Sequence, residues 1–234
     1  AQEVHDELLV RNLDTWNALI GAYSRQGRGY EALNCFLSMQ IEGLSPDVIT
    51  FIFLFKACGI IGNVDKGKVI HEEIVRKGLL DKHIALGNAL VDMYVKCGML
   101  GKAQEVLEEL SVRDVISWSA IIAGYAQQGQ GHQALNCFKE MKTEGFVPDE
   151  VTFLSLLSAC SHSGLLEEAQ MLFEDMSRKY GITPSLEHLT CILLVYGYAG
   201  RFNEAISMIR AMPSSDRPEV WLALLGACKK WGNI

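Results

Sequence analysis

Proline, long apolar runs and clustered metal ligands are all scarce in this chain of 234 residues. Its five prolines are too few for a proline-rich linker protein, and a hydrophobic content of 49% argues against intrinsic disorder. The most apolar stretch, residues 48–55, is far too short to cross a bilayer and is followed at once by Lys56. The N-terminus lacks the basic start and apolar run of a secretory signal. We therefore expect a soluble, folded protein.

Catalytic and metal-binding patterns are also missing. The seven cysteines are an odd number without a C-x-x-C pair, which indicates reduced, buried thiols. His71-Glu72-Glu73 matches half of a zinc deaminase signature, but no P-C-x-x-C follows it. The sequence shows no paired carboxylates, nucleophile triad or glycine-rich phosphate loop. We expect no enzyme, no metal and no cofactor.

The net charge of −7 opposes a protein that coats nucleic acid by bulk electrostatics. It leaves room for local basic positions along one groove.

What the sequence does contain is an internal repeat. Trp16 recurs 102 residues later as Trp118, and ALNCF at 32–36 recurs at 134–138. Inside this period lie units of about 35 residues, a length typical of one helix–turn–helix each. We place six repeats, with the end of a truncated repeat at 1–12 and the first helix of a truncated motif at 218–234; the six are 13–47, 48–83, 84–114, 115–149, 150–185 and 186–217.

Apolar spacing predicts the fold of each unit. Trp16, Leu19, Ile20 and Tyr23 follow the i, i+3, i+4, i+7 pattern of an amphipathic helix. Because no alternating strand pattern separates the helices, they must bury these stripes against neighbouring units. We predict an all-α fold, a right-handed α-solenoid forming one continuous superhelix with a concave face. A left-handed cap, which needs no Cβ, is expected at the glycine after each first helix: Gly27, Gly62, Gly98, Gly129, Gly164 and Gly200.

Several of these motifs resemble pentatricopeptide repeats (PPRs). They are the VITF and VTF openings, second helices of the form G-x-x-x-E-A-L-x-x-F-x-x-M, and closing E-G-x-x-P-D segments. Repeat lengths of 35, 36 and 31 resemble the plant PLS class, as do Lys96-Cys97-Gly98 and the LGAC segment at 225–228. Residues 220–234 resemble the start of an E-type extension. Tetratricopeptide repeats share the architecture but have a different residue signature.

In the PPR family, the fifth and last residues of a repeat together select one RNA base. The resemblance implies uracil for the first and third repeats and guanine for the fourth, while the sixth departs from the pattern because its last residue is Arg217. The corresponding pairs are Asn17 with Asp47, Asn88 with Asp114, Ser119 with Asp149, and Thr190 with Arg217. An asparagine carboxamide both donates and accepts, so it can match the mixed edge of uracil. The three aspartates are alternatively N-caps of the next helix.

Other positions carry weaker expectations. The residue that sandwiches a base is apolar at Ile116, whereas Asp14 and Glu187 occupy that place in the first and sixth repeats. Ile52 and Leu154, at the fifth position, cannot hydrogen-bond a base and are candidates for partner docking.

Cations near the ends of first helices, Arg25, Lys96 and His162, are expected to contact phosphates or to be solvated surface. Tryptophans 16, 118 and 221 could stack on bases, but their apolar stripe favours core packing. The cysteines at 58, 160 and 228 share one repeat position and are expected to be core fillers.

The resemblance implies a sequence-specific adaptor for single-stranded organellar RNA, in a mitochondrion or chloroplast, that acts as a specificity factor for C-to-U editing. Its implied partners are multiple organellar RNA editing factor proteins and a deaminase acting in trans or downstream. The alternatives are a protein-docking scaffold and a splicing or transcript-stability factor.

Overall fold

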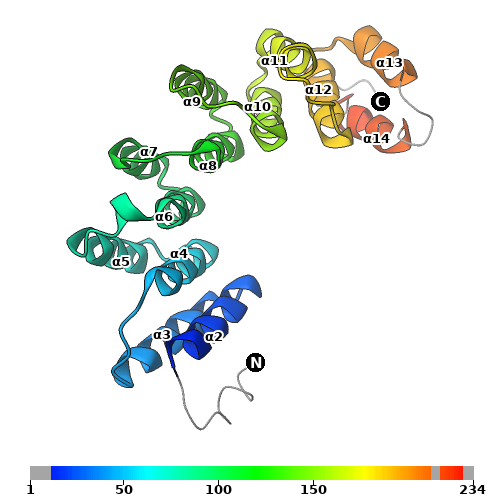
Figure 1. The fold of residues 1–234 in the computed structure, drawn as a ribbon. Helices are drawn as coiled ribbons and strands as arrows, with labels where there is room; N and C mark the ends of the chain where they lie inside the picture. The colour runs from blue at the N-terminus through cyan, green and yellow to red at the C-terminus, as the bar shows by residue number, and fades with distance from the viewer. Residues whose placement is uncertain (1–11, 212–216, 229–234) are drawn as a thin grey trace. The chain divides into compact units, whose positions relative to one another are not determined.

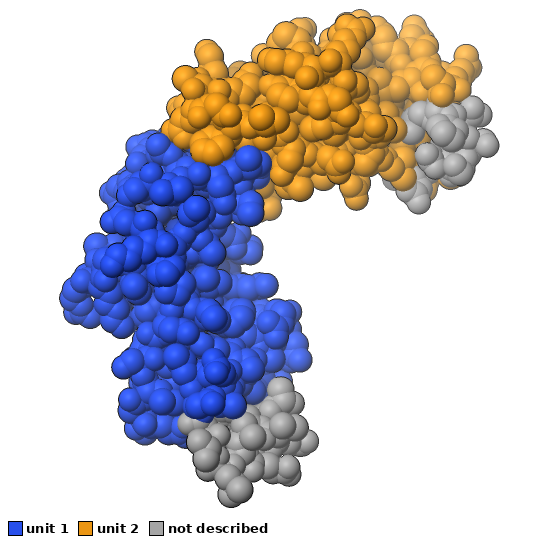
Figure 2. Space-filling view, in the orientation of Figure 1, with its two compact units in different colours: residues 1–121 blue, residues 122–234 orange. Residues whose placement is uncertain are grey.

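The computed structural model describes residues 12–211 and 217–228, without the side chains of Arg217, Glu219 and Cys228. All regular secondary structure in these two ranges is helical. The chain separates into two compact units, residues 1–121 and 122–234 (Figure 2). The boundary lies within helix α8 (Val115–Gln127).

The first unit is a stack of helical hairpins. Its first helices are α2 (Leu13–Arg25), α4 (Val48–Ile61) and α6 (Ile84–Lys96), and α4 packs against both α2 and α6. The second helices α5 and α7 lie on the same side of the α4–α6 pair (Figure 1). The second helices and a short 3-10 turn are α3 (Gly29–Ile41), α5 (Val64–Arg76), η1 (Leu80–Lys82) and α7 (Leu100–Glu109).

The second unit repeats the same arrangement. Helix α12 (Leu186–Tyr198) packs against α10 (Glu150–Ser163) and α14 (Arg217–Cys228). The second helices α11 and α13 pack on α10 and α12, the first helices of their own hairpins, and α9 packs on α10. Those second helices are α9 (Gly131–Thr143), α11 (Leu166–Arg178) and α13 (Phe202–Ala211). The fold is therefore an α-solenoid of helix–turn–helix units, as the sequence predicts.

First helices begin at residues 13, 48, 84, 115, 150 and 186, which are the first residues of the six repeats placed from the sequence. The division into repeats stays a prediction, as does the continuity of the six as one solenoid. The truncated repeat at 1–12 lies almost wholly outside the described residues, and so does the end of the motif at 218–234.

The turn inside each hairpin depends on glycine, as expected. Gly62 ends α4 in the left-handed region at φ 66°, and Gly164 ends α10 at φ 69°. At such φ values a Cβ is strained, so glycine is the residue with the lowest cost. The four other predicted cap glycines also have positive φ: Gly27, Gly98, Gly129 and Gly200.

Side chains from the apolar stripes fill the space between successive helices. Trp16 and Trp118 are buried, at 4% and 3% exposure, which confirms the core assignment over base stacking. Burial also raises the pKa of the Cys58 and Cys160 thiols to about 12, as expected for inert core fillers.

The expectation for Trp221 is wrong. It is 36% exposed, and Leu222 and Leu225 of the same helix are also exposed. The side chain of Cys228, the third predicted core cysteine, lies outside the described residues. None of the described helices is long and apolar enough to cross a membrane.

Replacing Leu90 tests the core directly. Leu90 of α6 is fully buried, so Leu90→Ala removes packed methyl groups and leaves a cavity. We expect the free energy of unfolding to fall by about 2–5 kcal/mol. Val112→Ala is the control, because Val112 is 49% exposed and its truncation should change stability by no more than about 0.5 kcal/mol. Urea unfolding followed by circular dichroism measures both, and equal losses would contradict the packing described.

Candidate functional site

A hydrogen-bonded pair joins the first two first helices. The amide Nδ2 of Asn17 in α2 donates to Oδ1 of Asp47 over 3.0 Å. The Thr50 hydroxyl lies 2.6 Å from Asn17 Oδ1 and 2.8 Å from Asp47 Oδ1. Asn17 is only 5% exposed. Both ends of its carboxamide therefore have a neighbour within hydrogen-bond distance, and the one Thr50 hydroxyl proton is shared between the Asn17 and Asp47 oxygens.

The same pair recurs in the third repeat with one difference. Asn88 Nδ2 in α6 lies 3.2 Å from each carboxylate oxygen of Asp114. The hydroxyl that follows this aspartate belongs to Ser117, and it bonds the Asp114 carbonyl at 2.9 Å and carboxylate at 3.1 Å, not Asn88. Among the described residues, the buried Oδ1 of Asn88 has no hydrogen-bond partner. This oxygen is a buried acceptor whose hydrogen-bonding capacity is unused, so a base reaches it only when the side chains that cover it move.

The aspartates of these pairs also cap helices. Asp47 accepts from the amide of Thr50 at 2.8 Å, Asp114 from Ser117 at 2.9 Å, and Asp149 from Thr152 at 2.8 Å. The capping interpretation is thus confirmed for all three. Capping contributes about 1 kcal/mol each, and it fixes each carboxylate at the start of a first helix.

Opposing effects act on the Asp47 carboxyl. Burial works to raise its pKa, but hydrogen bonds from the Thr50 amide, the Thr50 hydroxyl and the Asn17 amide outweigh burial. The pKa of Asp47 is therefore held below its usual value. The ionised carboxylate is the form that this network stabilises.

The other predicted base-selecting residues are less uniform. Ser119 is 7% exposed and belongs to the first unit, whereas Asp149 belongs to the second. The Thr190 hydroxyl donates to the Leu186 carbonyl four residues earlier, at 2.8 Å. The side chain of its predicted partner, Arg217, lies outside the described residues.

An exposed position recurs at the second residue of each repeat. Ile116 is 65% exposed, and the structure adds Ile49 at 51% and Val151 at 59%. Asp14 and Glu187 are exposed at the corresponding places in the first and sixth repeats, and so is Ala85 in the third. Ile49 and Val151 were not predicted as base-sandwiching residues, although their fixed place one residue after the start of the repeat could have identified them.

The cations predicted near helix ends already have contacts. Lys96 Nζ lies 2.6 Å from Asp92, and the Arg25 guanidinium lies 5.8 Å from the centre of the Phe53 ring. His162 Nδ1 lies 3.3 Å from the Ala126 carbonyl. These interactions hold the charges near the surface, and the phosphate assignment of Arg25 and Lys96 stays a prediction.

The remaining candidates are partly enclosed. Ile52 and Leu154 are half-buried at the fifth positions of the second and fifth repeats. His71, part of the chance deaminase match, bonds the Tyr94 hydroxyl at 3.0 Å. In the described ranges, no three His, Cys, Asp or Glu residues gather in a group that could hold a metal ion.

Removing the Asn17 amide should alter the titration of Asp47. We expect Asn17→Ala to raise the pKa of Asp47, because one of the hydrogen bonds to the ionised carboxylate is lost. Since the folded-state pKa is lowered, the stability that Asp47 contributes is complete above the ordinary carboxyl pKa of about 3.9 and is lost as pH falls through the folded value. NMR titration of the Asp47 side-chain carbon measures the change.

Asn34→Ala serves as the control for this titration, because Asn34 is exposed on the second helix α3. The Asp47 titration should be the same in this variant as in the unchanged chain. Identical titrations with and without the Asn17 amide would contradict the network.

Comparison with known proteins gives the family. The PPR repeat family matches residues 11–59 and 113–162, and the PPR repeat matches residues 88–115 and 151–180. The chain is similar to the Arabidopsis thaliana pentatricopeptide repeat-containing protein CRR2, chloroplastic, with 40% identity over 100% of this chain and 36% of the relative. A mitochondrial pentatricopeptide repeat-containing protein of A. thaliana is 37% identical over 100% of this chain and 50% of its own length. The chain thus spans between a third and a half of these relatives.

Solved structures agree with the fold. The crystal structure of the pentatricopeptide repeat protein PPR10 from maize matches with a TM-score of 0.55 and 21% identity, covering 99% of this chain and 38% of PPR10. The structure of PPR10 in complex with an 18-nt psaJ RNA element has a TM-score of 0.54 at 18% identity, and it covers 97% of this chain and 39% of that one. By its repeated motifs, its helical hairpins and these matches, the chain belongs to the pentatricopeptide repeat family.

Proposed function

We propose that this chain is a sequence-specific adaptor for single-stranded RNA in a plant organelle, with one base selected at each suitable repeat. The observation that carries the proposal is the third repeat. There, the Asn88 amide is oriented by Asp114 while its Oδ1 is buried without a partner among the described residues.

The geometry fits the edge of uracil. Uracil presents one N–H donor between two carbonyl acceptors, and the open Oδ1 of Asn88 is an acceptor for that N–H. The Asp114 carboxylate accepts from Nδ2, which leaves Oδ1 as the end of the carboxamide without a partner among the described residues. A buried acceptor that lacks a partner costs about 1–3 kcal/mol, so a base that places an N–H at this oxygen, as uracil does with its central N–H, is favoured over one that places an acceptor there.

Exposed aliphatic side chains support the same function. Ile49, Ile116 and Val151 each lie exposed near the start of a first helix. Single-stranded RNA is recognised through unstacked bases held against flat or apolar side chains and bonded along their edges. The recurring exposed position supplies the first contact, and the asparagine–aspartate pair supplies the second.

The known relatives agree with this proposal. PPR10 has been solved with an RNA element, and the relatives are named chloroplastic or mitochondrial. We propose that the chain acts as a specificity factor for C-to-U editing, with editing factor proteins and a deaminase as partners. A splicing or transcript-stability role would use the same RNA surface.

Catalysis is not proposed for this chain. One structural neighbour is a protein-only RNase P of A. thaliana, with a TM-score of 0.60 and 16% identity, so the fold also occurs in an enzyme. The described residues supply helix caps and polar pairs of a size to contact a base. We therefore assign the C-to-U editing reaction to a partner protein.

One observation favours protein docking as a second function. The α3 helix exposes an apolar stripe of Tyr30 at 65%, Leu37 at 46% and Ile41 at 86%. The residues that correspond to them 102 positions later are polar, namely His132, Lys139 and Thr143. Exposed apolar stripes of this kind are typical of protein-interaction surfaces.

Changing Asn88 tests the RNA proposal. Asn88→Ser replaces the carboxamide with a small hydroxyl beside the Asp114 carboxylate, which becomes free to accept from the N–H donors of guanine. We expect the preferred base at this position to change from uracil to guanine. Fluorescence anisotropy with single-stranded RNAs that differ in one nucleotide measures the preference, in a longer chain that carries further repeats.

The control makes the same substitution elsewhere. Asn34→Ser, on the exposed face of α3, should leave every base preference unchanged. RNA binding with no base preference at any position, or no binding even at low salt, would refute the adaptor function and leave protein docking as the alternative.

A further inference from the structure

Two lysines lie at the ends of second helices in the second unit. Lys142 is in the last turn of α9, and Lys179 follows α11 as its C-cap. The Lys142 ammonium lies 4.3 Å from the centre of the Phe138 ring, and the Lys179 ammonium lies 5.3 Å from the centre of the Tyr180 ring. Within the described part of the chain, neither ammonium has a carboxylate at ion-pair distance.

A row of aromatic rings connects the two lysines. The Phe138 and Phe153 centroids are 6.0 Å apart, and the Phe153 and Tyr180 centroids are 5.3 Å apart, both in edge-to-face arrangements. Each ammonium lies over one ring of this row, Lys142 over Phe138 and Lys179 over Tyr180. The two ammonium groups are therefore parts of one local cluster.

The corresponding part of the first unit lacks this feature. At the positions 102 residues earlier stand Gln40, which has no charge, and Lys77, whose ammonium is bound by Glu73 at 2.7 Å. In the second unit, Asp175 replaces this glutamate with a side chain one methylene shorter. The first unit therefore has one lysine paired with a carboxylate, whereas the second unit has two lysines, Lys142 and Lys179, without a carboxylate partner among the described residues.

The like charge of Lys179 acts on Lys142 in the same direction as burial. Burial lowers the pKa of Lys142, the nearby Lys179 lowers it further, and Asp175 acts in the opposite direction. A bound anion would relieve both the loss of solvent and the like-charge repulsion.

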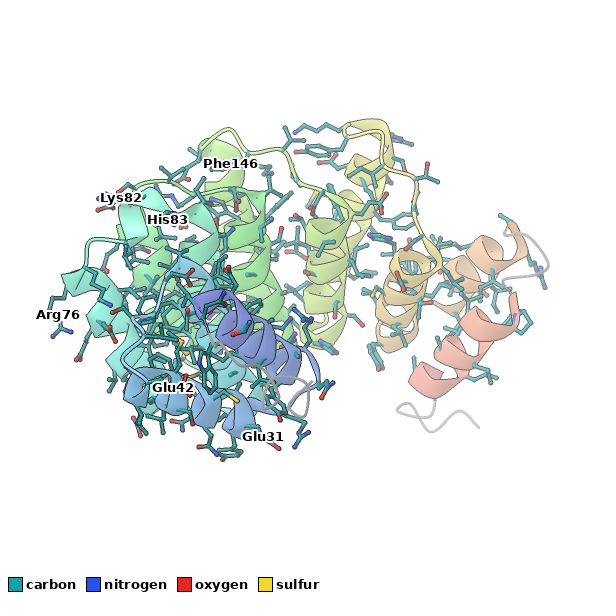
Figure 3. All side chains as sticks on the ribbon, turned by 60° about the horizontal axis from the view of Figure 1, so that its bottom comes forward. Glu31, Glu42, Arg76, Lys82, His83 and Phe146 are labelled. Carbon is teal, nitrogen blue, oxygen red and sulfur yellow. The ribbon has the colours of Figure 1, made fainter. Side chains whose placement is uncertain are left out.

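An open pocket of about 470 Å³ adjoins the cluster through Tyr180. Its wall comes from the start of α10 and the segment that follows α11, and consists of Pro148, Asp149, Glu150, Val151, Tyr180 and Ile182. The loop between α9 and α10, which contains the labelled Phe146 in Figure 3, leads directly into this wall. The pocket thus includes Val151, the exposed second residue of the fifth repeat.

A local backbone difference places the tyrosine ring there. Gly181 takes the left-handed conformation at φ 67°, one position later than its counterpart Gly78 in the first unit. Tyr180 therefore remains in the final turn, where its amide donates to the Asp175 carbonyl at 3.2 Å. Its ring packs on Phe153.

We propose that Lys142 and Lys179 bind a backbone phosphate of the RNA strand where the strand passes the pocket beside Val151. This inference rests on the proposed RNA-binding function. The carboxylates of Asp149 and Glu150 are in the pocket wall and repel a phosphate there, which favours an anion position at the lysines, beyond Tyr180. The contact positions the strand without selecting a base.

The test measures the salt dependence of RNA affinity in the double variant Lys142→Met with Lys179→Met. Methionine keeps an unbranched apolar stem over the rings and removes the charge. For single-stranded RNA, each phosphate contact contributes about 0.7 to the slope of log affinity against log salt. We expect the magnitude of the slope to fall by about 0.7, with the base preference at the third repeat unchanged.

Two control variants separate charge from structure. Lys77→Met removes the carboxylate-bound counterpart and should leave the slope unchanged. Replacing Lys142 and Lys179 by arginine keeps both charges and should preserve the slope.

An unchanged slope in the methionine variant, with RNA still bound and its base preference intact, would overturn the phosphate site alone and would point to an acidic protein partner instead. Absence of RNA binding by the unchanged chain would overturn the proposed function as well.

Discussion

The hydrogen bonds of one aspartate at the junction between repeats hold the rest of the site in place. Asp47 caps α4 through the Thr50 amide and accepts from Asn17 in the preceding first helix. Asp114 does the same for α8 and Asn88. A charged acceptor shared by two helices fixes the angle of each carboxamide relative to the next repeat, because hydrogen bonds to ionised groups are shorter and stronger than neutral ones. The proposed recognition of bases depends on that fixed angle.

Equivalent residues in different repeats are not equivalent in their bonding. Asn17 has both ends of its carboxamide occupied, since the Thr50 hydroxyl approaches its oxygen to 2.6 Å. At Asn88 the corresponding hydroxyl is that of Ser117, which bonds only Asp114. Oδ1 of Asn88 is therefore left without a hydrogen-bond partner among the described residues. A carboxamide oxygen can accept two hydrogen bonds, so a base would add a second bond at Asn17 but would supply the first one at Asn88. We therefore propose that the third repeat discriminates its base more strongly than the first.

The fold was predictable because its signals are local and repeated. Trp16 and Trp118 mark the same buried position, and the cap glycines mark every hairpin turn. Solenoid repeats contact mainly their neighbours, so a fold predicted correctly for one repeat also applies to the next repeat. Trp221 is the exception, since its burial depends on a neighbouring helix and not on its own pattern.

The site was predictable only in part, because its details depend on side-chain directions. Residue type indicated that Asn88 and Asp114 form a pair, but not that one oxygen would lack a partner. The sequence does not predict that Lys142 and Lys179 lie close together, because they are 37 residues apart in the chain. Their proximity depends on contacts among the rings of Phe138, Phe153 and Tyr180, and no sequence motif predicts these contacts.

The central claim is that the free oxygen of Asn88 accepts a hydrogen bond from a base. NMR of the Asn88 side-chain amide, with and without single-stranded RNA in a chain that binds it, measures this directly. We expect a large change in the Asn88 signals when uridine occupies the matching position and a much smaller change when cytidine replaces it. Equal responses to the two nucleotides, or no response to either while RNA is bound, would contradict the account.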